Sequence, residues 1–377
     1  MLIIKTNILG DFTFLILVLG LIQGIVVGII LLLTQKNKAQ RYLGLYVGLV
    51  GLQFAYYLFN YLSVTNDYPE LLLLPLDSIW LRAALLYRYA EKVSIFSNEQ
   101  KGKRFLFPGI IAFVIQFIVF WLPLDIKMAI KDSLYFNVFF GLGTLYNFTI
   151  AIFLVILIYR HFKEVKNQYS NTENKQLKWL WYYVLFSLGP LFVLILSYLV
   201  NFTYDYYIVM GITAIFLTYW VSIHGMMQIP IKSLLEKNSY TTIYEEASTP
   251  SQPIIPLEER LLVISQQIDN LVEEQEIYTK EELNISDVAS ALHLHPKDIS
   301  KAINSVKHKN FNAYINEYRI KKAITLIVDP QYHIWKMEGI SKEVGFKSKS
   351  SFYAAFKKVT GYTPSKFLQQ SQEKRAS

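Results

Sequence analysis

Two short runs near the C-terminus carry the side chains with the most distinctive chemistry. On helices over these runs, one outward face would present lysine, serine, asparagine and tyrosine. The first set is Lys297, Ser300, Lys301 and Asn304, and the second is Lys349, Ser350, Tyr353 and Lys357. All of these side chains donate hydrogen bonds, and the lysines also attract anions. The residue types favour a polyanionic partner, either nucleic acid or anionic lipid.

Positive charge is concentrated in the same part of the chain. Residues 283–377 hold 16 Lys and Arg against 7 Asp and Glu, a net charge of +9. The preceding residues 230–282 hold 4 against 11, a net charge of −7. An acidic segment thus precedes a basic domain. The alternative to a polyanion site is a basic surface that is only solvated.

The first run lies in a segment with the pattern of a helix-turn-helix, LNISDVASALHLHPKDISKAINSV (283–306). Ser286 is expected to cap a first helix. The turn is expected at His293–His295, and Ile299 and Ile303 face inward on the second helix at i and i+4.

The second run repeats this pattern after a long helix. FNAYINEYRIKKAITLI (311–327) is predicted to form that helix. Beyond it, Gly345 is expected to make the turn and Ser348 to cap the next helix. Phe352 and Phe356 would face inward on that helix at i and i+4.

The chain from about 277 to 370 resembles the two-helix-turn-helix DNA-binding domain of AraC-type transcription regulators. The residues that carry the resemblance are NEYRIKKAITLI and GFKSKSSFYAAFKKVTGYTPSKF, and it covers about a quarter of the chain. The arrangement also resembles regulators of this family with an N-terminal multi-span membrane domain. A helix of 17 residues, about 26 Å long, could set two recognition helices in major grooves roughly 34 Å apart.

The resemblance implies roles for the donor side chains. Base contacts are expected from Lys297, Ser300, Lys301, Lys349, Ser350 and Tyr353, with Asn304 on the same face as the first three. Phosphate contacts are expected from Ser348, Lys357, Lys358 and Lys366. Three positions depart from the family pattern: His293 replaces a common glycine, His295 a common serine cap, and Ala354 a common arginine.

The N-terminal part reads as a membrane domain, since 53% of the chain is hydrophobic and its mean hydropathy is +0.28. A span needs about 20 apolar residues. The candidate spans are 12–33, 42–63, 71–90, 105–124, 134–159, 179–200 and 206–228. Lys and Arg are frequent in alternate loops, which places the N-terminus outside and the C-terminus in the cytoplasm. The resemblance implies that the membrane is a bacterial inner membrane.

Four polar residues within the spans are candidates for binding a small ligand or for packing between helices: Asp77, Arg82, Gln116 and Asn147. Asp77 and Arg82 are predicted to lie on one helix, about 140° apart around it.

The predicted fold class is all-α, with a seven-helix transmembrane bundle followed by a cytoplasmic double helix-turn-helix domain. The domains are 1–228, a connector at 229–276, and 277–377. The connector holds a proline-rich linker and then a helix with an apolar seam over 257–271. That seam either forms a homodimer or packs against the following domain.

The residue pattern indicates a regulator rather than an enzyme. The chain has no cysteine, and we assign no catalytic residue, cofactor or metal. A zinc site from His293, His295 and His308 is disfavoured because their spacing is weak evidence. We expect a one-component transcription regulator whose membrane domain senses an unknown signal, with RNA polymerase a further candidate partner. The alternatives are a transporter or channel with a regulatory tail, and a passive tether.

Overall fold

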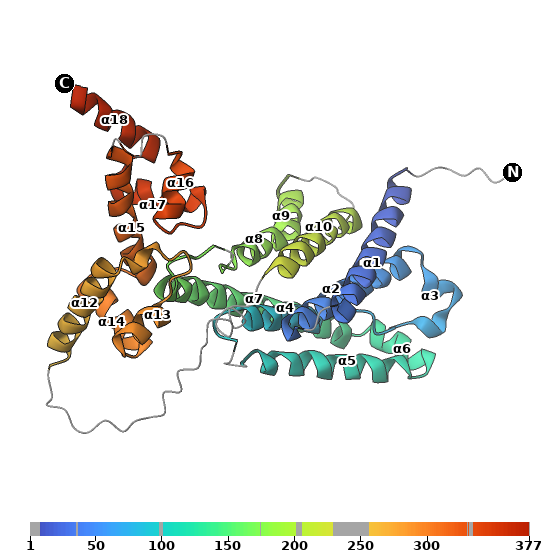
Figure 1. Ribbon diagram of the computed structural model, residues 1–377. Coiled ribbons are helices and arrows are strands. Elements are labelled where there is room, and N and C mark those ends of the chain that lie inside the picture. Colours follow the sequence, from blue (N-terminus) through green and yellow to red (C-terminus); the bar gives the residue numbers. More distant parts are fainter. Residues whose placement is uncertain are drawn as a thin grey trace. The chain divides into compact units, whose positions relative to one another are not determined.

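The computed structural model describes residues 8–34, 37–97, 101–173, 175–200, 206–228, 256–329, 331 and 335–376. All regular elements in these ranges are helical, apart from one isolated bridge between Tyr169 and Asn284. The chain forms two compact units (Figure 1). The first is Met1–His161 with Leu177–Ser239, and the second is Phe162–Gln176 with Tyr240–Ser377. The prediction of an all-α fold is confirmed, and the proline-rich linker lies outside the described residues.

The first unit is built of long apolar helices with short helical connections. Its elements are α1 (Ile8–Thr34), α2 (Lys38–Tyr61), α3 (Val64–Asp67), η1 (Pro69–Leu71), α4 (Ile79–Val93), η2 (Lys101–Phe105), α5 (Leu106–Phe120), α6 (Leu124–Lys131), α7 (Leu134–Gln168), α8 (Lys178–Ser187), α9 (Gly189–Val200) and α10 (Tyr206–Met227). Helix α7 extends beyond this unit, because its last residues belong to the second.

Four helical stretches are long and apolar enough to cross a membrane. They are Phe12–Thr34, Lys38–Tyr61, Lys101–Phe120 and Leu134–Gln168, and a shorter apolar stretch is Gly211–Met227. Many of their large apolar side chains are exposed, for example Phe107, Ile111 and Ile118 on α5. An exposed apolar surface of this extent suits contact with lipid rather than water.

Two of the predicted spans differ from the observed helices. Residues 72–78 of the third predicted span are not helical, since Leu73 has a left-handed backbone (φ 62°) and Pro75 follows it. The remaining helix, α4, has 15 residues and a length of about 22 Å. The sixth predicted span is divided into α8 and α9 at Leu188, two residues before Pro190, which cannot donate the backbone hydrogen bond of a continuous helix.

Glycines allow α1 and α2 to pack with their backbones in contact. A Cβ atom added to Gly24 would lie 2.4 Å from the Cα of Gly51, and one added to Gly51 would lie 2.8 Å from the backbone nitrogen of Ile25. Small residues at such crossings let the dispersion contacts of two membrane helices form along their backbones. The pair therefore depends on glycine at these positions.

Replacing Gly51 by alanine is expected to destabilise the first unit by about 1–3 kcal/mol, because α1 and α2 must separate to admit the methyl group. Gly48→Ala on the same helix is the matched control, since an added Cβ there meets nothing within 4 Å. Thermal unfolding of the detergent-solubilised protein measures both. Equal melting temperatures for the two variants would contradict the close packing.

The second unit consists of α12 (Leu257–Glu274), η3 (Ile277–Thr279), α13 (Ile285–Leu292), α14 (Pro296–Val306), α15 (Phe311–Val328), α16 (Met337–Glu343), α17 (Lys349–Thr360) and α18 (Pro364–Ala376). Two hydrophobic cores lie along α15; Figure 1 shows the helices of this unit around α15. The N-terminal half of α15 packs with α12, α13 and α14, and its C-terminal half packs with α16 and α17. Each core carries one helix-turn-helix, so α15 joins the two motifs.

The apolar seam of the connector packs inside this unit. Leu261, Ile264, Ile268 and Leu271 are buried in the first core, and only Leu257 is half exposed. Of the two alternatives for the seam, the structure shows packing against the following domain. In this arrangement the seam offers little apolar surface to a second copy of the chain.

Candidate nucleic-acid interface

The first helix-turn-helix comprises α13 and α14. Asn284 caps α13: its Oδ1 accepts from the backbone N–H of Ser286 at 2.9 Å and of Asp287 at 3.2 Å. The Asp287 carboxylate accepts in return from the Asn284 N–H at 2.9 Å, which completes a capping box. The predicted cap, Ser286, is therefore wrong by two residues. Asn284 has the extended backbone that a cap requires, and Ser286 is already in the helix.

Two histidines replace the usual residues of the turn without loss of its geometry. His293 has the left-handed backbone (φ 54°) that glycine often supplies. The Nδ1 atom of His295 accepts from the backbone N–H of Lys297 at 3.1 Å, so the imidazole caps α14 in place of serine. Both histidines thus have structural roles that explain their presence.

The predicted donor face of α14 is on its outer side. Ile299, Ala302 and Ile303 are buried, while Lys297, Lys301 and Asn304 are exposed and Ser300 is half-buried. The Asn304 amide donates to the Ser300 carbonyl oxygen at 2.8 Å and to its Oγ at 3.2 Å. Asn304 is exposed, and its side-chain carbonyl oxygen can still accept a hydrogen bond.

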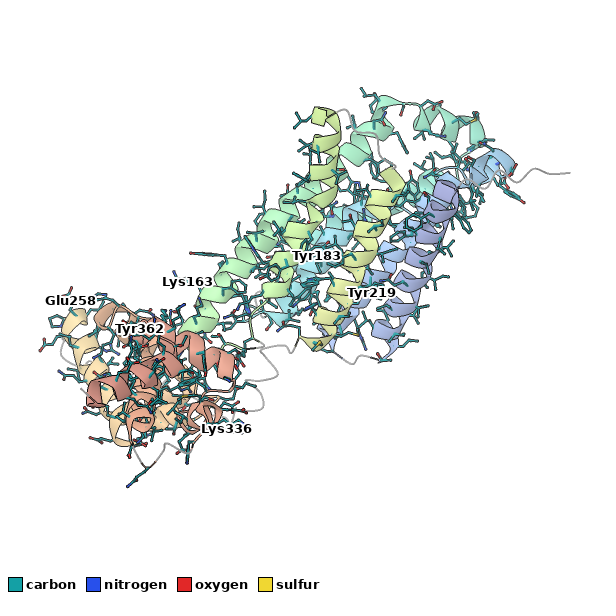
Figure 2. The ribbon with its side chains drawn as sticks, turned by 90° about the horizontal axis from the view of Figure 1, so that it is seen from above. Lys163, Tyr183, Tyr219, Glu258, Lys336 and Tyr362 are labelled. Carbon is teal, nitrogen blue, oxygen red and sulfur yellow. The ribbon has the colours of Figure 1, made fainter. Side chains whose placement is uncertain are left out.

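The second helix-turn-helix comprises α16 and α17. Ser348 caps α17 by accepting from the backbone N–H of Ser351 at 3.2 Å, as predicted. Phe352 and Phe356 are fully buried, which confirms the predicted inner face. The predicted outer residues are exposed at Lys349, Ser350, Lys357, Lys358 and Lys366 and half-buried at Ser348 and Tyr353. Lys366 and Tyr362 form a cation–π contact next to α17, and the Tyr362 side chain is exposed (Figure 2 labels it).

Gly345 packs the turn of the second motif against the segment before the first. Its φ is +91°, and a Cβ atom added to it would lie 2.5 Å from the carbonyl oxygen of Thr279. The predicted turn is confirmed, and the close approach adds a reason for glycine that the sequence did not reveal.

Arg319 connects the parts of this domain from within. Its side chain is 1% exposed on α15 and donates from Nε to the Tyr278 carbonyl oxygen at 2.6 Å and from Nη2 to that of Lys280 at 2.7 Å. The guanidinium also lies over the Phe346 ring, 5.4 Å from its centroid. Burial lowers the pKa of Arg319 to about 10, so it stays charged at neutral pH. The position was not among the predicted site residues.

Asp269 of α12 holds the first core closed. Its carboxylate accepts from Lys307 Nζ at 2.5 Å, Tyr314 OH at 2.8 Å and Tyr318 OH at 3.1 Å. Burial by itself raises the pKa of Asp269, but these hydrogen bonds outweigh it and the pKa lies below its usual value. The same contacts raise the pKa of Tyr314 and Tyr318, together with burial, which is the largest cause.

Replacing Asp269 by asparagine is expected to cost about 1–2 kcal/mol at pH 7, because the hydrogen bonds to a charged acceptor are lost. A depressed pKa stabilises the fold above the unfolded value near 3.9, and that stability is lost as pH falls through the folded value. The wild type should thus approach the variant below about pH 4. A fluorophore on Glu258→Cys, at the start of α12 (Figure 2), reports urea unfolding from pH 3 to 7.

Glu276 and Glu282 also have pKa values below their usual range in the folded protein. The wild type and Asp269→Asn therefore both lose stability in acid. Only the difference between wild type and variant belongs to Asp269. A constant difference across the pH range would contradict the assigned network.

The four polar candidates of the first unit lie in different surroundings. Asp77 and Gln116 line a cavity of about 310 Å³ with mainly apolar and aromatic neighbours. Arg82 is not among the lining residues, and its Nε is buried without a hydrogen bond within the described residues. Asn147 donates to the carbonyl oxygens of Ile79 and of Gly143, the second at 2.8 Å, so it joins α7 to α4.

Asp77 does not share a helix with Arg82, contrary to the prediction. It precedes α4, and its Oδ1 accepts from the backbone N–H of Ile79 at 2.8 Å, while Oδ2 accepts from Gln53 Nε2 at 3.3 Å. The predicted angle of about 140° around one helix therefore has no basis. Each carboxylate oxygen can accept a further hydrogen bond, and Asp77 is among the residues that line the cavity.

No group of three or more His, Asp or Glu side chains that could hold a metal ion occurs among the described residues. Within this part of the chain, His295 instead uses its Nδ1 as the cap of α14.

Two helix-turn-helix motifs on one connecting helix, each with a donor-rich outer face, define a DNA-binding domain. The comparisons agree with this class. Residues 288–370 match the protein family described as "Helix-turn-helix domain". The chain is 29% identical to the Regulatory protein PocR of Salmonella typhimurium over 96 residues, which are 26% of this chain and 31% of the relative. No solved structure matches significantly.

The C-terminal domain is therefore a helix-turn-helix domain of the AraC type, as its residues indicated. The matches support a DNA-binding regulator. The chain spans about a third of the length of the relative it matches, and the match covers about a quarter of this chain.

Proposed function

We propose that this chain is a membrane-bound, one-component transcription regulator that binds duplex DNA through both helix-turn-helix motifs. The observation that carries the proposal is the pair of capped helices, α14 and α17, at the two ends of α15. Each buries an apolar face, and the opposite face carries exposed lysines beside serine and amide or phenol groups that are exposed or half-buried. Such faces suit phosphate contacts that position the protein and base contacts that select sequence.

The proposed location is a bacterial cytoplasmic membrane, with the DNA-binding domain on the cytoplasmic side. Four helical stretches of sufficient length and apolar character support insertion. Lys and Arg are frequent in the loops at 34–41, 91–104 and 160–178 and scarce at 64–70 and 201–205. That alternation supports seven crossings with the N-terminus outside.

The proposed sensor is the cavity that contains Asp77 and Gln116. Its volume of about 310 Å³ suits a small ligand, and its walls include Tyr56, Phe136 and Phe139. Asp77 keeps acceptor capacity there, so the ligand class that fits best is a largely apolar molecule with a cationic or hydrogen-bond-donating group.

Binding of a mixed-sequence DNA duplex by the full-length protein tests the core proposal. In nanodiscs of zwitterionic lipid, fluorescence anisotropy should show binding at about 50 mM salt that weakens steeply toward 200 mM, because phosphate contacts release counterions. Zwitterionic lipid removes competition from an anionic membrane surface. Absence of any salt-sensitive DNA binding would overturn the proposed function.

A panel of apolar amines tests the sensor. Amines that enter the cavity should raise the melting temperature of the wild-type protein and not that of Asp77→Asn, which keeps the shape of the side chain. Gln116→Glu is the complementary variant, because it adds a negative charge to the cavity wall, and amines should raise its melting temperature more than that of the wild type. Asn147 is left unchanged because its amide joins α7 to α4. Flux of a stabilising amine through proteoliposomes would favour the transporter alternative.

A further inference from the structure

A segment from the membrane part of the sequence lies on the DNA-binding domain. Residues 162–176 include the end of α7 and the loop that leads to α8, and they belong to the second compact unit. Within them, Tyr169, Ser170, Asn171 and Lys175 are each at most 7% exposed. Such burial of a polar loop requires specific partners for its hydrogen-bonding groups.

Ser170 is the centre of this contact. Its backbone N–H and its Oγ both donate to the Leu283 carbonyl oxygen, at 3.0 and 2.6 Å, just before the cap of α13. The Asn312 amide donates to the Ser170 carbonyl oxygen, and Arg319 Nη2 donates to its Oγ at 3.1 Å. Ser170 thus reaches the first motif and the connecting helix together.

Glu282 fixes the rest of the segment. Lys175 Nζ donates to one carboxylate oxygen at 2.6 Å, and the Asn171 amide donates to the other at 3.1 Å. Lys347, directly before the cap of α17, donates to the second oxygen at 3.2 Å. Burial raises the pKa of Glu282, but the two lysines outweigh it and hold the pKa below its usual value.

Glu173 brings a second carboxylate to the start of α17. The Ser348 hydroxyl donates to its Oε1 while it caps the helix. A helix N-terminus attracts anions, and Ser348 is a predicted phosphate contact. The carboxylate therefore stands where a DNA phosphate is expected, and the neighbouring Lys347 is paired with Glu282.

We infer that residues 169–173, together with Lys175, are a built-in competitor of DNA, in which the Glu173 carboxylate occupies the phosphate position at the N-terminus of α17. Ser170, Asn171 and Lys175 anchor the segment, and Glu173 accepts a hydrogen bond from Ser348 at the start of α17. DNA that engages both motifs must displace Glu173. This inference rests on the proposed DNA binding and deepens it by naming a regulatory contact.

The competitor gives a route for a signal that differs from the connector. Residues 169–175 are continuous in the chain with α7 and α8 of the membrane part. A ligand that moves the end of α7 or the start of α8 would therefore act on this segment directly through the chain. The outer face of α14 stays exposed while Glu173 is bonded to Ser348. In this state the protein therefore binds DNA weakly through the first motif and lacks the contacts of the second.

Glu173→Gln tests the competition, because it removes the charge and keeps the size of the side chain. Full-length protein in zwitterionic nanodiscs should bind a mixed-sequence duplex about three- to tenfold more tightly than wild type at 50 mM salt. The magnitude of the salt slope should grow by at least about one, because the released second motif adds one or more phosphate contacts.

Glu164→Gln is the matched control. It makes the same change of charge in the same stretch of chain, but Glu164 pairs with Asn167 and Gln168 on α7. Its DNA affinity should stay within about twofold of wild type. An equal gain in both variants, or none in Glu173→Gln while wild type binds DNA, overturns the competitor. If neither wild type nor variant binds DNA, the proposed function fails instead.

A thiol at the segment gives a second measurement that does not depend on affinity. The chain has no cysteine, so Thr172→Cys provides a unique thiol in the loop and Lys163→Cys one on the exposed side of α7 (Figure 2). Saturating DNA should raise the rate of maleimide modification at position 172 about fivefold or more and leave that at position 163 unchanged. An unchanged rate at position 172 shows that DNA does not displace the segment, and overturns the inference.

Discussion

Arg319→Met should loosen the whole DNA-binding domain. The guanidinium satisfies the carbonyl oxygens of Tyr278 and Lys280 and touches Phe346 of the second motif. Methionine fills similar space but donates no hydrogen bond. The Lys280 carbonyl still accepts from the backbone N–H of Leu283 at 3.2 Å, whereas the buried Tyr278 carbonyl loses its donor, at a cost of about 1–3 kcal/mol. With the hydrogen bond to Lys280 and the contact with Phe346 also lost, a destabilisation of about 3 kcal/mol is expected. Amide hydrogen exchange in α15 and η3 should accelerate on the order of a hundredfold.

Two further variants separate hydrogen bonding from charge. Arg319→Lys keeps the charge but cannot donate to both carbonyl groups in the planar fork of arginine, so exchange should be intermediate. Lys321→Met makes the same exchange of a cation for an apolar group on the exposed side of α15 and should leave protection unchanged. Wild-type protection in Arg319→Met would show that the two carbonyl groups find other partners.

Local sequence patterns were enough to predict the two motifs, because their determinants are close in the chain. The i, i+4 pairs Ile299–Ile303 and Phe352–Phe356 are buried, and Ser348 caps α17. The error at Ser286 is of the same local kind: Asn284 and Ser286 are both good caps, and only the backbone conformation separates them.

Contacts between distant segments could not be predicted in this way. Arg319 resembles any surface arginine of a helix, since the carbonyl groups that it satisfies lie about 40 residues earlier. The docking of Ser170 on Leu283 spans more than 100 residues and uses backbone groups that every residue possesses. Asp77 was placed on a helix because hydropathy does not register the turn at Leu73 and Pro75.

The exposed lysines of the second unit are expected to make two kinds of DNA contact. Some contact bases and select the sequence, and others contact phosphates and contribute affinity for any sequence. Lys301 and Lys349 point outward near the middle and the start of their helices, whereas Lys357, Lys358 and Lys366 lie toward the end of α17 and beyond it. A good base contact contributes about 1–3 kcal/mol of discrimination, which is roughly 5- to 150-fold in affinity.

Lys349→Gln is therefore expected to weaken binding to selected sites by at least about fivefold and to relax sequence preference over one half-site, with little change on mixed-sequence DNA. Lys358→Gln should weaken binding to all sequences alike and reduce the salt slope by about one. In vitro selection from a random library, followed by salt titration, measures both properties. Lys321→Gln on α15 is the control for loss of one positive charge.

The outcome at Lys349 also decides what Ala354 means for this domain. Ala354 is exposed on α17 where arginine is common, so the second motif has one cation fewer to read bases. If Lys349→Gln changes affinity equally on every sequence, the second motif contacts phosphates alone and selection rests on α14. If Lys349→Gln changes the sequence preference, Lys349 makes the base contact that alanine at position 354 cannot make. Ala354→Arg should then add specificity in the same half-site.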